Sequence, residues 1–122
     1  MRKILIVDDD QRNIFALTAT LKQRGFQCIN ATYAEEGLKL LDNDSSIFAI
    51  MLDMMMPDMD GYQMIETIRK NESLKKIPII AVTARAMPGD REKCLESGAD
   101  EYISKPIDVD VMFKVLDNYL NN

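Results

Sequence analysis

"FAIMLDMMMPDMDG" (residues 48–61) holds the pattern from which the fold of this chain can be worked out. Five apolar residues, 48–52, lead directly into one carboxylate, Asp53, and then into three methionines, a proline and an Asp-Met-Asp-Gly turn. A continuous apolar run of this length predicts a strand that is covered on both faces. The single acid at the end of such a strand needs a chemical explanation.

Other apolar runs resemble this one. Residues 3–7 and 78–82 are continuous apolar segments, whereas 27–31 and 101–104 are weaker and are expected nearer the edges of a sheet. Helical spacing of apolar residues lies between the runs, and glycines at 25 and 98 mark two helix ends. Four of the five helices are predicted from apolar residues at helical spacing, and the fourth in chain order is expected at about 89–97. The apolar residues are Ile14, Leu17 and Leu21; Ala34, Leu38 and Leu41; Met64, Ile65 and Ile68; and, in a last helix from about 108, Met112, Phe113, Leu116 and Leu120.

Alternation of five strands with five helices predicts the fold class. It is α/β: a single doubly wound (βα)5 sandwich over residues 1–122, flavodoxin-like, with a five-stranded parallel sheet of order 2-1-3-4-5. Right-handed crossovers place the carboxyl ends of all the strands along one edge of the sheet. Ligands of such sheets bind beyond that edge, here between the first and third strands.

Composition narrows the class of protein further. The 122 residues suit one domain, and 15 basic against 20 acidic residues give a net charge of -5, which argues against a nucleic-acid surface. No apolar run approaches the length that spans a membrane, and a strand expected from residue 3 leaves no room for a signal peptide. Cys28 and Cys94 are too few for a disulfide framework. A cytoplasmic domain with free thiols is therefore expected.

Polar residues follow the predicted strands where each one ends. The first strand leads into Asp8, Asp9 and Asp10, the third into Asp53, the fourth into Thr83, and the fifth into Lys105. Two like charges about 4 Å apart repel by about 4 kcal/mol at an effective dielectric near 20, so clustered carboxylates need a cation. Lys105 can neutralise one charge, and Mg2+ is the expected partner of the others. With no histidine in the chain, a structural zinc site is not expected.

This set of groups suits phosphoryl transfer. A carboxylate can attack phosphorus to form an aspartyl phosphate, while a metal, an ammonium group and a hydroxyl stabilise the transferring group. Asp53 is the best candidate for the nucleophile because it stands alone after a buried strand. Taken singly, each residue has an ordinary explanation, such as a turn, a helix cap or a surface charge, and the methionines are most simply core filler. The site is favoured because all four strand ends supply a suitable group.

The segments "ILIVDDD", "LDMMMPDMDG", "AVTA" and "GADEYISKP" together resemble the receiver domain of two-component signalling, the CheY-like superfamily, over essentially the whole chain, residues 1–122. The stretch 81–107, "AVTARAMPGDREKCLESGADEYISKPI", is similar to receivers of hybrid histidine kinases. Residues of the family's site are carried over by position. The resemblance implies a phosphoacceptor at Asp53, Mg2+ ligands at Asp8, Asp9, Asp53 and the Met55 carbonyl, a phosphoryl contact at Lys105 with a cis bond to Pro106, and switch residues at Thr83 and Tyr102.

Other positions are assigned more loosely by the same resemblance. Pro57 and Gly61 match the loop after the acceptor, and Asp10 receives no direct role. Met55 and Arg85, two residues beyond the acceptor and the threonine, flank the path of an attacking water and are expected to tune hydrolysis of the phosphoryl group.

The resemblance implies a signalling switch rather than an enzyme acting on other substrates; its reactions are phosphotransfer to its own Asp53 and loss of that phosphoryl group. A histidine kinase or a histidine phosphotransfer protein would donate the group. Phosphorylation would then reshape the face formed by the fourth helix, the fifth strand and the fifth helix through Thr83 and Tyr102. Neither nucleic acid nor membrane is expected as a direct partner, and the downstream protein target stays unidentified.

Three other functions compete with this one. In a haloacid-dehalogenase-like phosphatase Asp8 and Asp10 would form the catalytic pair, but Arg12 and Asn13 stand where its Thr or Val is expected, the chain has no room for a cap, and Asp53 would be unexplained. A flavin-binding domain would need hydroxyls and amides where the first loop is acidic. An interaction module that works without phosphorylation is the third alternative.

Overall fold

The computed structural model describes residues 3–84 and 87–120, and in these ranges five β-strands alternate with five α-helices. None of the described helices is both long and apolar enough to span a membrane. The elements are, in chain order, β1 (Lys3–Val7), α1 (Gln11–Gln23), β2 (Gln27–Ala31), α2 (Ala34–Asn43), β3 (Ile47–Asp53), α3 (Gly61–Lys70), β4 (Ile79–Thr83), α4 (Asp90–Ser97), β5 (Glu101–Ser104) and α5 (Val109–Leu120).

The strands form one parallel sheet of order β2-β1-β3-β4-β5, which confirms the predicted fold class and strand order. The two weak strand candidates, β2 and β5, lie at the edges, and the three continuous apolar runs lie in the centre. This arrangement follows from burial, because a central strand has helices over both faces and must be apolar on both. The predicted site edge is therefore the edge at which β1 and β3 end side by side.

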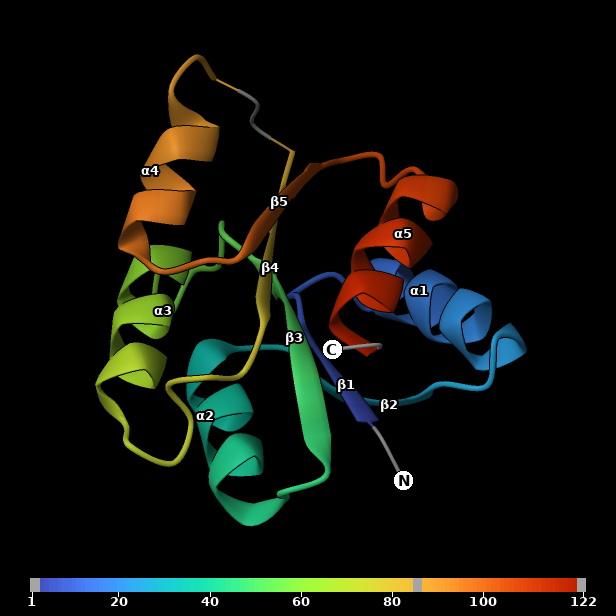
Figure 1. Ribbon diagram of the computed structural model, residues 1–122, viewed down its shortest axis with the longest axis horizontal. Helices are drawn as coiled ribbons and strands as arrows, with labels where there is room; N and C mark the ends of the chain where they lie inside the picture. Colours follow the sequence, from blue (N-terminus) through green and yellow to red (C-terminus); the bar gives the residue numbers. More distant parts are fainter. Residues whose placement is uncertain (1–2, 85–86, 121–122) are drawn as a thin grey trace.

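Helices cover the sheet in two layers, α1 and α5 on one face and α2, α3 and α4 on the other (Figure 1). Alternate residues of each central strand point into opposite layers: Ile4 and Ile6 of β1 pack with α1 and α5, whereas Leu5 and Val7 pack with α2 and α3. Two cores of this kind position the central strands rigidly, so the side chains at their carboxyl ends have a fixed frame.

Helix ends follow from local side-chain chemistry. Asp10 caps α1 by accepting a hydrogen bond from the Arg12 amide, and Asp60 forms a reciprocal capping box with Gln63 at the start of α3. Gly98, with a φ of 120°, ends α4 in a conformation that side chains with a Cβ avoid. Asp10 thus has the structural role that the sequence analysis did not assign to it.

Some predicted boundaries were wrong by one residue. β3 runs from Ile47 to Asp53 and β4 from Ile79 to Thr83, so the acceptor candidate and the threonine are the last residues of their strands rather than the first residues beyond them. Ladder pairing extends the strands this far, since Asp53 is in register with Val82 and Thr83 with Ser104. Two predicted features, the side chain of Leu120 and the residue Arg85, lie outside the described part of the chain.

Candidate functional site at the carboxyl edge of the sheet

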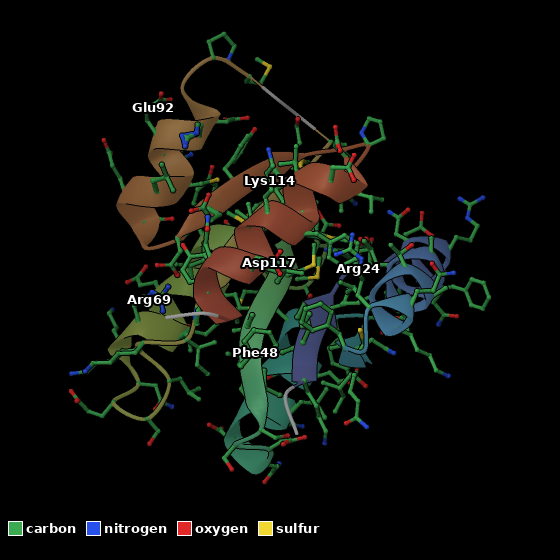
Figure 2. The ribbon with its side chains drawn as sticks, turned by 45° about the vertical axis from the view of Figure 1, so that its right-hand side comes forward. Arg24, Phe48, Arg69, Glu92, Lys114 and Asp117 are labelled. Atoms are coloured by element: carbon green, nitrogen blue, oxygen red, sulfur yellow. The ribbon has the colours of Figure 1, made fainter. Side chains whose placement is uncertain are left out.

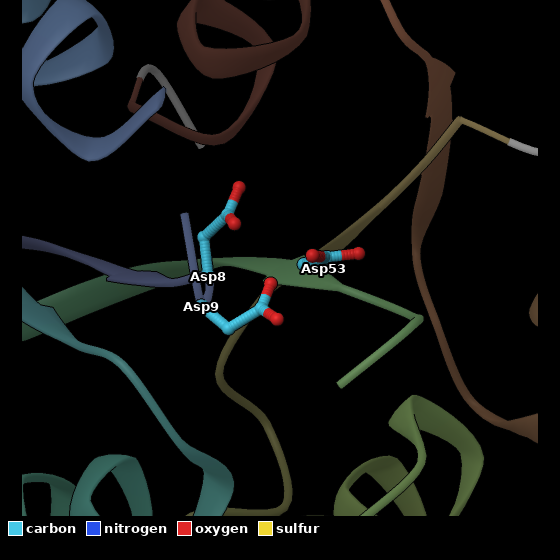
Figure 3. Close-up of side chains that lie close together, drawn as sticks. All are labelled: Asp8, Asp9 and Asp53. Atoms are coloured by element: carbon cyan, nitrogen blue, oxygen red, sulfur yellow. The ribbon is translucent and has the colours of Figure 1, made fainter. Parts of the chain in front are cut away.

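Three carboxylates meet beyond the ends of β1 and β3. Asp8 and Asp9 follow β1, and Asp53 is the last residue of β3. One carboxylate oxygen from each of the three lies within 4.8 Å of the others, and the close-up of this edge shows the three side chains close together (Figure 3). The parallel pairing of β1 with β3 brings them together, because it places Val7 opposite Leu52 and so ends both strands at the same level.

Lys105 supplies the positive charge of this cluster from the turn after β5. Its ammonium Nζ donates a hydrogen bond to Asp8 Oδ2 over 3.2 Å and lies 3.7 Å from Asp53 Oδ2. Its amide donates to the carbonyl of Thr83 over 2.8 Å, which holds the turn against the end of β4. The peptide bond between Lys105 and Pro106 is cis, as the resemblance implied.

Backbone hydrogen bonds hold the acceptor candidate in one orientation. The amide of Met55 donates to Asp53 Oδ1 over 3.0 Å, so one carboxylate oxygen is fixed while the other faces Lys105. The next amide back along the chain, that of Met54, donates to the carbonyl of Val82 over 2.9 Å and ties the chain to β4. Asp8 is oriented in the same way, because its Oδ1 accepts from the Asp10 amide over 2.9 Å.

Burial and charge both act on the Asp53 carboxylate. Asp53 is 6% exposed and Asp8 3% exposed, whereas Asp9 is exposed to solvent. Burial raises the pKa of Asp53 above its usual value, and the charges of Asp8 and Asp9 raise it further, while the Met55 amide and the Lys105 ammonium oppose the shift. The site therefore favours a positively charged species beside Asp53.

The cluster fits a hard divalent cation. Its donors are carboxylate oxygens close enough to share one ion, and two of the three acids are too buried for water to screen their repulsion fully. The fourth expected ligand was the carbonyl of Met55, two residues beyond Asp53. Met55 and Asp9 line the same cavity at this edge of the sheet. Both cysteines are free and outside this group, which agrees with the expectation of oxygen ligands.

A cavity of about 640 Å³ opens beside the acids and leads toward α4. Tyr62, in the first turn of α3, lies against it, with its hydroxyl 3.7 Å from the Cys94 sulfur and its ring 4.5 Å below the Lys93 ammonium. Sequence reasoning missed this group, because no spacing rule connects the start of α3 with α4. The residues that line the cavity are Asp9, Met54, Met55, Met56, Pro57, Asp60, Tyr62, Thr83, Asp90 and Lys93.

The two expected switch residues lie on neighbouring strands, Thr83 at the end of β4 and Tyr102 within β5. Thr83 is buried, at 4% exposed, and lines the cavity. Tyr102 belongs to β5 in register with Ala81, is partly buried, and packs against the core layer of α2, α3 and α4. Burial raises the pKa of Tyr102 above its usual value. Because the buried face of Tyr102 belongs to the α4 layer, a movement of α4 would change its surroundings.

Removing the charge of Asp53 should stabilise the metal-free fold. Its raised pKa means that the folded state binds the proton more tightly than the unfolded state, so the free energy of unfolding falls as pH rises from the unfolded pKa to the folded pKa and stays lower at neutral pH. Asp53→Asn should therefore be more stable than the wild type by about 1 kcal/mol at pH 7 in EDTA, a typical size for one substitution, with a smaller difference at pH 3. Chemical denaturation at several pH values measures this. Asp117→Asn, at an exposed acid of α5, is the control; an equal gain there would refute the assignment.

Comparisons with known proteins agree on the class of domain. The sequence model of the response regulator receiver domain matches residues 4–117. Hybrid signal transduction histidine kinase I of Dictyostelium discoideum is 37% identical over an alignment of 128 residues, gaps included, that covers 98% of this chain. The chain spans only 7% of that kinase. The polar-differentiation response regulator DivK of Brucella ovis is 31% identical over 121 residues, which cover 99% of this chain and 98% of DivK.

A solved structure extends the comparison to three dimensions. The receiver domain of sensor histidine kinase PA1611 from Pseudomonas aeruginosa PAO1 superposes with a TM-score of 0.89 at 30% identity, covering 99% of this chain and 98% of that one. That structure is described as having a magnesium ion coordinated in its active-site cleft. The similarity therefore extends over the sheet, all its helices and the edge at which the acids lie.

Proposed function

This chain belongs to the response regulator receiver domain family, and from that membership we propose that residues 1–122 form a phosphoacceptor switch of a two-component or phosphorelay system. The phosphoryl group is received by Asp53. One observation carries this proposal: Asp53 is a buried carboxylate at the end of a central strand, oriented by the Met55 amide and lying 3.7 Å from the Lys105 ammonium. Asp8 and Asp9 stand beside it, and each offers a carboxylate oxygen within 4.8 Å of one from Asp53.

The transfer exchanges one bond at phosphorus for another. An oxygen of Asp53 attacks the phosphorus of a phosphohistidine donor, the O–P bond forms, the P–N bond breaks, and its electron pair returns to the imidazole nitrogen. Lys105 neutralises charge on the transferring oxygens, because its ammonium already lies between Asp8 and Asp53. The Met55 amide keeps the Asp53 carboxylate aligned for the attack. Loss of the phosphoryl group to water completes the cycle.

Mg2+ is the cofactor in this proposal. Asp8, Asp9, Asp53 and the Met55 carbonyl would hold it, since the three carboxylates offer one oxygen each within 4.8 Å. When bound, the cation supplies charge neutralisation at the phosphoryl oxygens. Asp9, the most exposed of the acids, faces the opening through which the cation would enter.

Phosphorylation acts as a switch through Thr83 and Tyr102. Thr83 lines the cavity beside Asp53. A shift of the chain at the end of β4 would bring its hydroxyl to a phosphoryl oxygen, to which it would donate a hydrogen bond. Tyr102 follows because it packs in the layer of α4, and the face formed by α4, β5 and α5 changes shape. To move the ratio of active to inactive molecules from about 1:99 to about 99:1, phosphorylation must favour the active state by about 5.5 kcal/mol.

The partners follow from the chemistry of the donor. A histidine kinase or a histidine phosphotransfer protein delivers the group, and the similarity both to histidine kinases and to the response regulator DivK supports a donor of this kind. Two free cysteines fit a cytoplasmic location, and the net charge of -5 fits protein partners rather than nucleic acid or an anionic membrane. The domain transfers phosphoryl groups only to and from its own Asp53 and is no enzyme for other substrates.

Intact-mass measurement after incubation with acetyl phosphate tests the proposed function. The wild-type chain should gain the mass of one phosphoryl group in millimolar Mg2+ and none in EDTA, because the acids repel the donor without a cation. The adduct should be lost with hydroxylamine, as an acyl phosphate is. A chain that takes up no phosphoryl group from acetyl phosphate or from a phosphorylated histidine kinase would be an interaction module instead.

A further inference from the structure

We propose that Asp58 is a positioning residue that ties the loop beyond the acceptor, residues 54–60, to the start of α2 and thereby holds the site in its metal-binding geometry. The inference rests on the proposed function, because it concerns the same site. Asp58 lies in the loop between β3 and α3, five residues beyond Asp53, and its side chain is exposed. It takes no part in the contacts between the acids and Lys105 described above.

The geometry of Asp58 joins two segments far apart in the sequence. Its two carboxylate oxygens accept hydrogen bonds from the Ala34 amide at 3.2 and 3.1 Å, and Oδ2 also accepts from the Glu35 amide at 3.4 Å. These amides open α2, where backbone donors have no partner within the helix and the helix dipole favours an anion. The residue before α2, Tyr33, makes no side-chain cap. Asp58 therefore supplies from another loop the cap that α2 lacks in its own sequence.

At both ends of the loop, backbone amides donate the hydrogen bonds that hold it, whereas Asp58 accepts through its side chain. The first amides of the loop bind Asp53 and Val82, and the Gly61 amide at its far end donates to the Met54 carbonyl over 3.2 Å. Gly61 packs so tightly here that an added Cβ would lie 2.7 Å from Met54 Cα. Within the described chain, the hydrogen bonds that hold the middle of the loop, residues 56–59, to another element are those of Asp58.

The consequence concerns Met55, the loop residue that serves the site. Its amide orients Asp53, and its carbonyl is the expected fourth ligand of the cation. The Met55 side chain is 49% exposed, so it adds little packing of its own between the buried side chains of Met54 and Met56. With its middle released from α2, the loop would sample positions in which the Met55 amide and carbonyl leave the site. Asp58 thus acts on the site through the loop, without touching the cation or the phosphoryl group.

Asp58→Ala tests the proposal. The variant should bind Mg2+ about tenfold more weakly, at the low end of the loss seen when groups that orient metal ligands are removed. Amide hydrogen exchange should speed up at Met55 as well as at Ala34 and Glu35, and this readout needs neither metal nor phosphate. Asp58→Asn keeps an oxygen that can accept from the same amides and should restore most of the affinity.

Glu36→Ala is the matched control. Glu36 accepts a hydrogen bond from the Thr32 amide over 2.9 Å at the same helix start but does not reach the loop. Both alanine variants should lower the melting temperature by about 4 °C. Only Asp58→Ala should weaken Mg2+ binding and expose the Met55 amide. Equal weakening by both variants, or by neither, would overturn the positioning role.

The proposed function and the positioning role fail in different ways. If the wild type neither binds Mg2+ nor takes up a phosphoryl group, the proposed function is wrong, and the exchange rate of the Met55 amide still tests whether Asp58 holds the loop. If the wild type does both and Asp58→Ala matches it in affinity and exchange, the positioning role alone is wrong.

Discussion

Replacing Asp53 with Asn is expected to abolish the phosphoryl adduct completely. The amide oxygen of Asn is too weak a nucleophile to attack phosphorus. Asp8 is also buried, oriented by an amide and paired with Lys105, whereas Asp53 is the proposed acceptor as the last residue of the central strand β3. The side chain keeps its size and can still accept from the Met55 amide, so the fold should remain intact. Intact mass after acetyl phosphate and Mg2+ measures the loss, with circular dichroism as the check on folding.

Asp8→Asn is the control for this experiment. Asp8 accepts from the Asp10 amide and from Lys105, and it is expected to hold the cation but not the phosphoryl group. Its variant should be phosphorylated more slowly, and the slowing should lessen as Mg2+ is raised. An adduct that persists in Asp53→Asn and disappears in Asp8→Asn would instead place the nucleophile after β1, as in a haloacid-dehalogenase-like phosphatase. Fragmentation of the adduct would locate the modified residue directly.

Replacing Arg69 with Ala is expected to lower the free energy of unfolding by about 3 kcal/mol, typical of a charged hub whose partners are left unpaired. Figure 2 labels Arg69 on α3. Its guanidinium donates to the carbonyls of Lys75, Ile77 and Gly98 at 2.8 to 2.9 Å and pairs with Asp100 at 2.7 Å. The Asp100 carboxylate in turn accepts from the Ile79 amide at the start of β4. One side chain therefore joins the end of α3 to the segments that open β4 and β5.

Lys70→Ala is the matched control, one residue further along the same helix. Lys70 pairs with Glu66 over 2.8 Å, but the two side chains are 75% and 64% exposed, so the pair should contribute less than about 0.5 kcal/mol. Arg69→Lys keeps the charge but not the planar fork, and its stability should fall between wild type and alanine. Urea denaturation measures all three. A loss in Arg69→Ala no larger than that in Lys70→Ala would refute the role.

Phosphorylation should survive in the Arg69 variant wherever it is folded. The Arg69 group lies at the amino ends of β4 and β5, whereas the acids lie at the carboxyl ends of the strands. Stability and chemistry are thus carried by opposite edges of the same sheet, and the two substitutions, Asp53→Asn and Arg69→Ala, should separate them. Loss of the adduct from folded Arg69→Ala would show that the two edges are coupled.

The amino-acid sequence by itself determined the elements and their order. Continuous apolar runs distinguish strands covered on both faces from the weaker edge strands, and this distinction is local, because burial on two faces allows no polar residue. The strand ends could be read in the same way: an acid after 48–52 and acids after 3–7 must meet once the strands are parallel. The capping box of Asp60 and Gln63 was also readable from its spacing, although it was missed.

Only the tertiary structure decided which distant side chains make contact. Asp58 reaches the amides of α2, 23 and 24 residues earlier in the chain, and Arg69 reaches Asp100, 31 residues later. Lys105 reaches Asp8 across 97 residues. Such contacts depend on the register of strands and the packing of helices, where a shift of one residue turns a side chain to the opposite face. No local pattern carries that information, so the chemistry could be read from the sequence while its support came from the fold.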